Sequence, residues 1–335
     1  MLRSLTVLIR DSFQPEKEVS MKALDKVYDA VVPSLISRLE EYDRCIKQGL
    51  DAPFSPWVKR WKNDGTHCAL EPISARNGVS KRPYSGINWV ILGLLSEYKS
   101  VDWFTLNQLK KLTGNDRPIP EGAWDTSEEI IFFKMNRFTD QYGDEVQFPL
   151  AKTYRVWNRE EIPGLPDPVP DVKPEEFEVR SEIDSYIKKI NLKGGIHYGG
   201  DRAFYRPSDD GIACPQESAF ESWEEFEATK AHETVHATGA KHRLDRTKGK
   251  RFGDEAYAYE ELVAELGAAM ICSHVGIPLE RLQHTQYIHG WLKRLKSDKK
   301  FLFNAAADAG RAFNYLIDEH ASPQNESKES LACAA

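Results

Sequence analysis

The pentapeptide His232-Glu233-Thr234-Val235-His236 is the most informative stretch of this 335-residue chain. Residues four apart lie on one face of an α-helix, so the two imidazoles can bind the same zinc ion. Glu233 follows the first histidine and can act as a general base toward the open side of the metal. The spacing therefore predicts a zinc site of the metallopeptidase kind.

The flanking residues predict that the pentapeptide lies on a helix over residues 223–238. Ser222 and Glu225 have the capping-box spacing, and no proline interrupts the segment. Gly239 stands where a left-handed cap can end the helix.

Two sets of residues compete for the third metal ligand. Glu261 and Glu265 are spaced i, i+4 on a second predicted helix, so one carboxylate can bind zinc while the other holds a ligand histidine by its second nitrogen. Residues 232–242 also fit the metzincin pattern His-Glu-x-x-His-x-x-Gly-x-x-His, in which His242 is the third ligand. That class needs a methionine turn beneath the metal, but the only downstream methionine, Met270, falls within the helix of Glu261. We therefore favour Glu261.

The N-terminal half combines aromatic and basic residues, although the whole chain has a net charge of −7. Between Trp57 and Arg117 there are ten basic and five acidic side chains. Aromatic faces can stack on bases and basic side chains can neutralise phosphates, which is typical of a single-stranded nucleic-acid surface. We expect about half of the aromatic residues of this segment to be buried in a core, Trp89 foremost. This expectation concerns the six aromatic candidates for base stacking, Trp57, Trp61, Tyr84, Trp89, Trp103 and Phe104.

Composition and organisation favour a two-domain cytoplasmic protein without a membrane partner. The five cysteines are scattered, no secretory leader is evident, and the longest uncharged stretch, residues 83–96, is shorter than the ~20 apolar residues of a membrane span. Five prolines in residues 163–176 indicate a linker. We predict a first domain over residues 1–162, a linker over 163–178, a second domain over 179–320 and a disordered tail over 321–335.

At this point the sequence resembles the ArdC-type antirestriction proteins and the related TraC-type plasmid primase proteins. In the C-terminal half, the similarity lies in Ala203-Phe204-Tyr205-x-Pro207, His232-Glu233-x-x-His236-x-Thr238-Gly239 and Glu260-Glu261-Leu262-Val263-Ala264-Glu265. In the N-terminal half it lies in Trp57-x-x-x-Trp61, Arg82-x-Tyr84-x-Gly86-Ile87-Asn88, Trp103-x-Thr105-x-x-Gln108 and Val156-x-Asn158.

The resemblance implies an α+β fold in both halves. The C-terminal domain resembles a zincin metallopeptidase, with Glu233 as catalytic base, His232, His236 and Glu261 as Zn²⁺ ligands and Glu265 assisting a ligand. The N-terminal domain resembles a single-stranded-DNA-binding domain, although residues 121–129 are acidic where the family has a basic stretch. The DNA-binding residues implied are Trp57, Lys59, Arg60, Trp61, Arg82, Tyr84, Asn88, Trp103, Thr105 and Gln108.

The function expected is that of a protein of a mobile element or phage that binds incoming single-stranded DNA and shields it from restriction. Two alternatives remain open. The protein can be a zinc metalloprotease acting on a host protein or peptide, with DNA binding only for delivery, or a non-catalytic DNA-binding protein whose zinc is structural. For an active peptidase, Tyr205, His197 and Tyr257 are the candidates to stabilise the oxyanion.

Overall fold

The computed structural model describes residues 3–48, 75–96, 98–139, 145–166, 175–246, 255–277 and 288–318. The N-terminal half contains α1 (Arg3–Lys47), β1 (Arg76–Asn77), α2 (Gly86–Trp89) continued by a π-helical segment (Val90–Leu95), β2 (Asp102–Thr105), α3 (Leu106–Thr113), β3 (Glu128–Thr139), β4 (Glu145–Asn158) and a 3₁₀ turn (Arg159–Glu161). The C-terminal half contains α4 (Glu176–Ile190), β5 (Gly195–Tyr198), β6 (Phe204–Arg206), β7 (Gly211–Cys214), a 3₁₀ turn (Glu217–Ala219), α5 (Trp223–Thr238), α6 (Glu255–Val275), α7 (Ile288–Ser297) and α8 (Lys300–Ile317). Both halves mix helices with strands, which confirms the α+β class.

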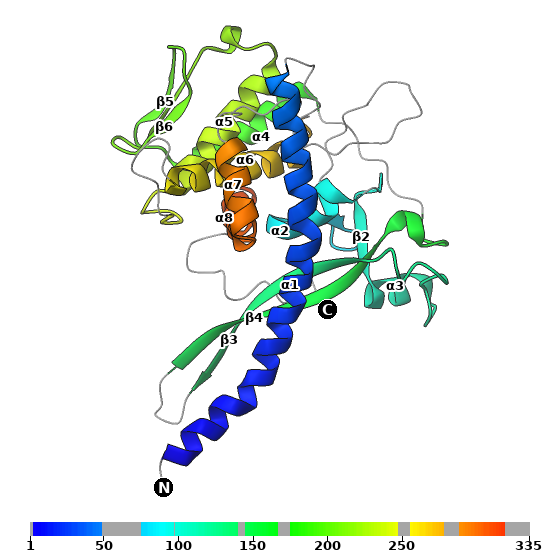
Figure 1. The fold of residues 1–335 in the computed structure, drawn as a ribbon. Coiled ribbons are helices and arrows are strands. Elements are labelled where there is room, and N and C mark those ends of the chain that lie inside the picture. The colour runs from blue at the N-terminus through cyan, green and yellow to red at the C-terminus, as the bar shows by residue number, and fades with distance from the viewer. Residues whose placement is uncertain are drawn as a thin grey trace.

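Each half has its own sheet among the described residues (Figure 1). The N-terminal sheet has the order β1-β2-β4-β3; β1 is parallel to β2, and the other pairs are antiparallel. The C-terminal sheet has the order β5-β7-β6, in which β5 is parallel and β6 antiparallel to β7. The central strand β7 is buried along its length, because α5 packs against it.

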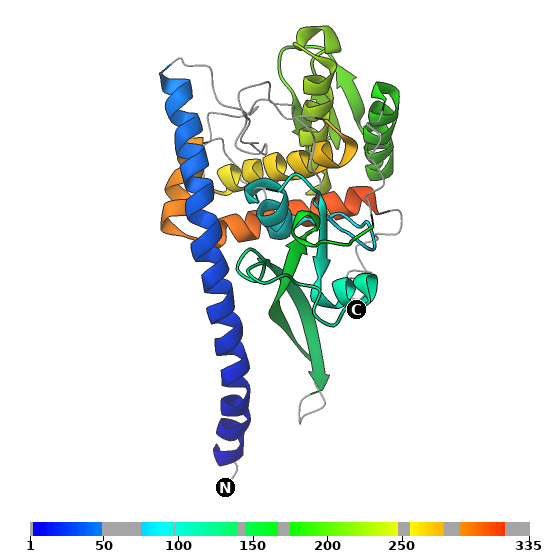
Figure 2. The ribbon, with the colours of Figure 1, turned by 90° about the vertical axis from the view of Figure 1, so that its right-hand side faces the viewer.

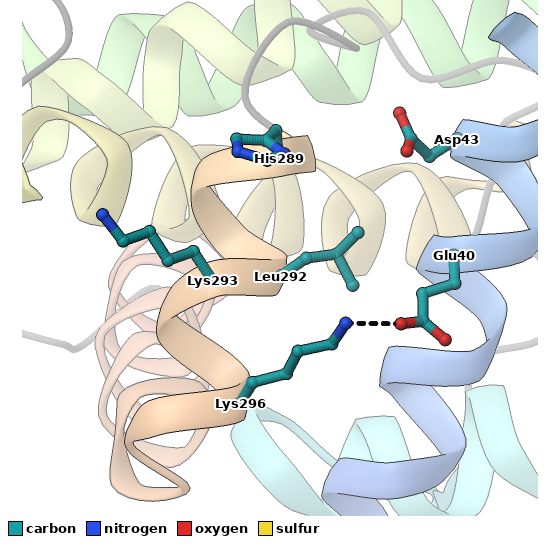
Figure 3. A pocket seen from close by; sticks show the side chains of 6 residues that line it. All are labelled: Glu40, Asp43, His289, Leu292, Lys293 and Lys296. Atoms are coloured by element: carbon teal, nitrogen blue, oxygen red, sulfur yellow. Dashed lines mark ion pairs between the residues drawn. The ribbon is translucent and has the colours of Figure 1, made fainter.

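The long helix α1 ties the two halves together. Its N-terminal turns extend beyond the body of the protein, whereas its C-terminal part lies beside α7 (Figures 1 and 2). Lys296 of α7 pairs with Glu40 of α1 at 2.6 Å across a pocket that Asp43 and His289 also line (Figure 3). The first and last thirds of the chain therefore contact each other.

The two halves also meet where α2 crosses α8. Gly86 has a left-handed backbone (φ 61°), and a Cβ on Gly310 of α8 would lie 2.7 Å from the Gly86 nitrogen. Asn314 adds a hydrogen bond to Ser85 Oγ at 3.2 Å. One hydrophobic cluster runs through this junction, from Val27 in α1 to Leu316 in α8. The halves are thus packed against each other, and only glycine at both positions permits the close approach.

The two helices predicted around the candidate metal residues are present as α5 and α6. The predicted domain boundaries remain predictions, since residues 167–174 of the proline-rich stretch and the tail at 321–335 lie outside the described residues. Within the described parts of the chain, no helix is long and apolar enough to cross a membrane.

Candidate metal centre

Helix α5 carries the His-Glu-x-x-His residues on a buried face. The helix spans Trp223–Thr238 as predicted, and Ser222 Oγ accepts a hydrogen bond from the Glu225 nitrogen at 3.2 Å. The capping box is not reciprocal, because Glu225 accepts from the Glu221 nitrogen instead. The expected left-handed cap is wrong: Gly239 has φ −74° and continues the right-handed turn.

Helix α6 brings Glu261 to the two histidines. Glu261 Oε2 lies 3.6 Å from His232 Nε2, and Glu261 Oε1 lies 3.5 Å from His236 Nε2. Tetrahedral ligands at the usual zinc–nitrogen distance are about 3.3 Å apart, so these separations fit a shared divalent metal ion. The three ligand atoms all lie within 4.8 Å of one another.

The close approach of α6 to α5 depends on a glycine. A Cβ on Gly267 would lie 2.9 Å from both methyl carbons of Val235, the residue before His236. The absence of a side chain at Gly267 therefore sets the spacing of the helices that carry the three ligands.

Oppositely charged neighbours favour the charged forms of the buried His236 and Glu261 side chains. Burial alone would lower the pKa of His236, but Glu260 and Glu261 raise it to about 10. Burial would likewise raise the pKa of Glu261, but His232 and His236 hold it below its usual range. Since a nitrogen that binds a metal must be deprotonated, a metal ion that binds here displaces a proton from His236.

Glu233 lies between the two histidines on α5 and is buried. Its position is that of the general base in the predicted motif. Glu265 is also buried on α6, one turn beyond Glu261. Its expected role of assisting a metal ligand stays a prediction.

Sequence reasoning missed Glu260 and Arg246. Glu260 Oε1 lies 3.3 Å from His236 Nδ1, and Arg246 pairs with Glu260 at 2.9 Å. The only feature of the sequence that could have indicated a role for Glu260 was its place directly before Glu261. Of these two acids, Glu261 alone is spaced i, i+4 with Glu265. Nothing in the spacing connects Arg246 with Glu260, fourteen positions further along the chain, because the contact depends on how the chain turns after α5.

The alternative third ligand His242 is directed elsewhere. His242 is half exposed, and its Nε2 lies 3.4 Å from Asp210 Oδ2. Asp210 is held mainly by Arg243, which donates to both of its oxygens at 2.8 Å. Tyr205 also donates to Asp210 Oδ1 at 2.8 Å. Among the described residues, the only group able to hold a metal ion is His232, His236 and Glu261, and His242 is outside it.

The three oxyanion candidates differ in their surroundings. The Tyr205 hydroxyl is engaged by Asp210, and burial together with that carboxylate raises the pKa of Tyr205 to about 12. His197 is exposed on β5, and Tyr257 is half-buried on α6. The choice among them remains open.

The predicted DNA-binding residues divide into three groups. Trp57, Lys59, Arg60 and Trp61 lie outside the described residues. Arg82 is exposed and Tyr84 is half-buried against the core. The remaining four, Asn88, Trp103, Thr105 and Gln108, have structural contacts.

These contacts correct the expectation for two residues. The Trp103 side chain is 0% exposed and offers no face to a base. Trp89 and Phe104 are also buried. Asn88 is buried and exchanges two hydrogen bonds of 2.8 Å with the backbone of Ile131. Sequence alone could not separate these roles, because an aromatic or amide side chain serves a core and a ligand equally well.

Thr105 and Gln108 form the capping box that begins α3. Gln108 donates its backbone N–H to Thr105 Oγ1 at 3.4 Å, and the Gln108 amide oxygen accepts from the Thr105 nitrogen at 2.9 Å. The Gln108 amide also donates to Asn77 Oδ1 at 3.1 Å. Asn77 Oδ1 in turn accepts from the backbone nitrogens of Val79 and Ser80, so Gln108 supports the turn that presents Lys81 and Arg82.

A cluster of positive charge surrounds one buried carboxylate beside this turn. Asp102 forms ion pairs with Arg76 at 2.7 Å, Lys81 at 3.0 Å and Arg159 at 3.3 Å. Burial would raise the pKa of Asp102, but Arg76 and Lys81 hold it below its usual range. Three cations thus face one buried carboxylate, with exposed Arg82 next to Lys81 and with Glu160 following Arg159 in the same 3₁₀ turn.

Comparisons with known proteins match both halves of the chain. Residues 25–157 match the family model described as the N-terminal domain of anti-restriction factor ArdC, and residues 181–308 match a zincin-like metallopeptidase model. The metal-free crystal structure of antirestriction ArdC protein from the R388 plasmid is 30% identical, covers 84% of this chain and 96% of its own, and has a TM-score of 0.59. The chain belongs to the ArdC antirestriction family.

Other relatives agree with this membership. A Mn(II)-bound structure of the R388 ArdC protein matches at 28% identity with a TM-score of 0.59, over 84% of this chain and 96% of that one. An uncharacterized protein, y4eC, of Sinorhizobium fredii (strain NBRC 101917 / NGR234) is 30% identical over 88% of this chain and 96% of its own length. DNA primase TraC of Escherichia coli is 33% identical over 82% of this chain, which corresponds to 19% of that longer protein.

Proposed function

We propose that this antirestriction protein binds single-stranded DNA through its N-terminal half and carries a zinc-dependent peptidase centre in its C-terminal half. The peptidase centre is supported by one observation: His232, His236 and Glu261 place their ligand atoms within 4.8 Å of one another. Glu233 lies on the same helix as the two histidines. The membership in the ArdC family supports the first part. The protein would act in the cytoplasm on behalf of a mobile element.

The residues of the centre would divide the work of peptide hydrolysis. His232, His236 and Glu261 would hold Zn²⁺, which when bound polarises a carbonyl and lowers the pKa of a water molecule. Glu233 would accept a proton from the attacking water and pass it to the leaving amine nitrogen. Burial of Glu233 keeps bulk water from competing for that proton.

The basic side chains around Asp102 support DNA binding. Arg82 is exposed on the turn after β1 and can reach a phosphate of a single strand, and Lys81 beside it would exchange Asp102 for a phosphate. Asp102, with Arg76 and Arg159, would hold the base of this surface in place. Tyr84, half-buried beside the turn, is the described aromatic residue that we propose for stacking on a base.

A Glu233→Ala variant tests whether hydrolysis matters for protection. We expect the variant to retain zinc, because Glu233 is not in the ligand set, and to lose any peptidase activity. If transferred DNA is still protected from restriction by this variant, then the protein acts as a DNA shield and hydrolysis is dispensable. If protection is lost while zinc and DNA binding persist, then cleavage of a host protein or peptide is part of the function.

Titration of labelled single-stranded and duplex DNA at several salt concentrations tests the other half. We expect tighter binding of the single strand, with an affinity that falls as salt rises. Replacing Lys81 and Arg82 together by Gln should reduce the salt slope by about 1.4, since each phosphate contact on a single strand contributes about 0.7. Lys188→Gln, at an exposed position of α4, is the matched control and should not change the slope.

A further inference from the structure

We propose that Glu260 and Arg246 position His236 for metal binding, an inference that rests on the proposed metal centre. The two ring nitrogens of His236 face different carboxylates. Nε2 lies 3.5 Å from Glu261 Oε1, and Nδ1 lies 3.3 Å from Glu260 Oε1. A neutral imidazole binds a metal through the nitrogen that carries no proton, so a carboxylate at Nδ1 would keep the proton there and leave the Nε2 lone pair for the metal ion.

Arg246 fixes the carboxylate of Glu260. Its guanidinium donates to Glu260 Oε1 at 2.9 Å and to Oε2 at 3.3 Å, a two-point contact that leaves the carboxylate little freedom to rotate. The same guanidinium donates to Thr238 Oγ1 at 2.7 Å and to the Val235 carbonyl at 2.6 Å. Since Val235 and Thr238 flank His236 on α5, Arg246 aligns Glu260 with the helix that carries the histidine.

The Arg246–Glu260 pair is buried. The side chains of Arg246 and Glu260 are only 4% and 6% exposed, so water cannot replace a lost contact. Glu260 Oε1 lies between Arg246 at 2.9 Å and His236 Nδ1 at 3.3 Å, so the protein itself supplies both partners of this oxygen. The position of Glu260 is therefore set by the protein and is maintained before any ligand arrives.

A neighbouring pair provides an internal comparison. Arg243, three positions before Arg246, is also buried and pairs with a carboxylate, Asp210, through two bonds of 2.8 Å. It likewise binds the end of α5, through the Ala237 carbonyl at 2.9 Å. Its carboxylate partner does not contact a member of the metal cluster in any interaction found among the described residues. If Arg246 only fastened the end of α5, as Arg243 does, then replacing either arginine would have the same effect on metal binding.

The test measures Zn²⁺ affinity of the full chain by competition with a chromophoric chelator, and the visible spectrum of the Co²⁺-loaded protein. Glu260→Gln keeps the shape of the side chain and should weaken Zn²⁺ binding by about 10- to 100-fold. Arg246→Lys, which loses the two-point contact, should weaken binding in the same direction and alter the Co²⁺ bands. Arg243→Lys is the matched control: it can lower thermal stability but should leave both metal readouts as in the wild type.

The outcomes separate this inference from the proposed metal centre. If the wild type does not bind Zn²⁺, the metal centre itself fails. If the wild type binds Zn²⁺ and Glu260→Gln binds it equally well, the positioning role is overturned and the centre stands. Equal losses in Arg243→Lys and Arg246→Lys would also overturn it. Should Glu260→Gln not fold, Glu260→Asp keeps the charge but withdraws it from Nδ1 by one methylene, and wild-type affinity in that variant would refute the proposal.

Discussion

The crossing of α2 and α8 predicts that Gly310→Ala destabilises the protein. The added Cβ would lie 2.7 Å from the nitrogen and 2.9 Å from the Cα of Gly86, both backbone atoms that cannot rotate away. Forcing such contacts in a packed interior costs about 1–3 kcal/mol. Alanine gains about 0.5–1 kcal/mol over glycine within a helix, so the net loss should be about 0.5–2 kcal/mol.

Gly290→Ala in α7 isolates the steric part of that loss. Among the residues that the structure describes, a Cβ at Gly290 meets only the Ala258 methyl, at an ordinary 3.8 Å, so this variant should gain the helical preference without a clash. The difference in free energy of unfolding between the two variants, measured by urea denaturation, should be about 1–3 kcal/mol in favour of Gly290→Ala. Equal stabilities would show that the two halves are not packed as described.

Three further predictions concern charged groups. Lys230→Met should cost about 3 kcal/mol in urea denaturation, because it removes the ammonium 3.0 Å from buried Glu227 and leaves only Arg180, at 3.8 Å, paired with that carboxylate among the described residues. A loss below about 1 kcal/mol would contradict the packing of this pair. The Asp210–Arg243 pair holds the pKa of Asp210 at about 2, below its usual value, so its contribution to stability is present above about pH 4 and is lost as the pH falls toward 2. Asp210→Asn should therefore flatten the pH dependence of unfolding in that window, and an unchanged profile would refute the assignment. Arg82→Gln should weaken single-stranded DNA binding and reduce its salt slope by about 0.7; an unchanged slope would exclude Arg82 from phosphate contact.

The pairing of His232 with His236 was predictable from the sequence because helical spacing fixes it. Two histidines four residues apart must share a face once the segment is helical, and α5 has the predicted bounds. The third ligand needed an additional argument, since Glu261 and His242 each fitted a known spacing. The structure brings Glu261 to the histidines and pairs His242 with Asp210.

The contacts that hold the ligands were not predictable in the same way. Arg246 reaches Glu260 because the chain turns back after α5, and no periodicity records that turn. The N-terminal half shows the same limit for Trp103, whose side chain is buried in the hydrophobic cluster that joins the two halves, edge-to-face with Tyr98. Local spacing thus predicts which residues share an element, whereas the partners across elements depend on the tertiary structure.

The zinc content of the purified protein shows whether His232, His236 and Glu261 bind one metal ion together. Wild-type protein and Glu261→Ala would be equilibrated with Zn²⁺, separated from free metal by gel filtration and assayed for zinc per chain. We expect about one zinc ion per chain in the wild type and far less in the variant, because two histidines alone make an incomplete site. Equal zinc content in the two proteins would contradict the assignment of His232, His236 and Glu261 as a single metal centre.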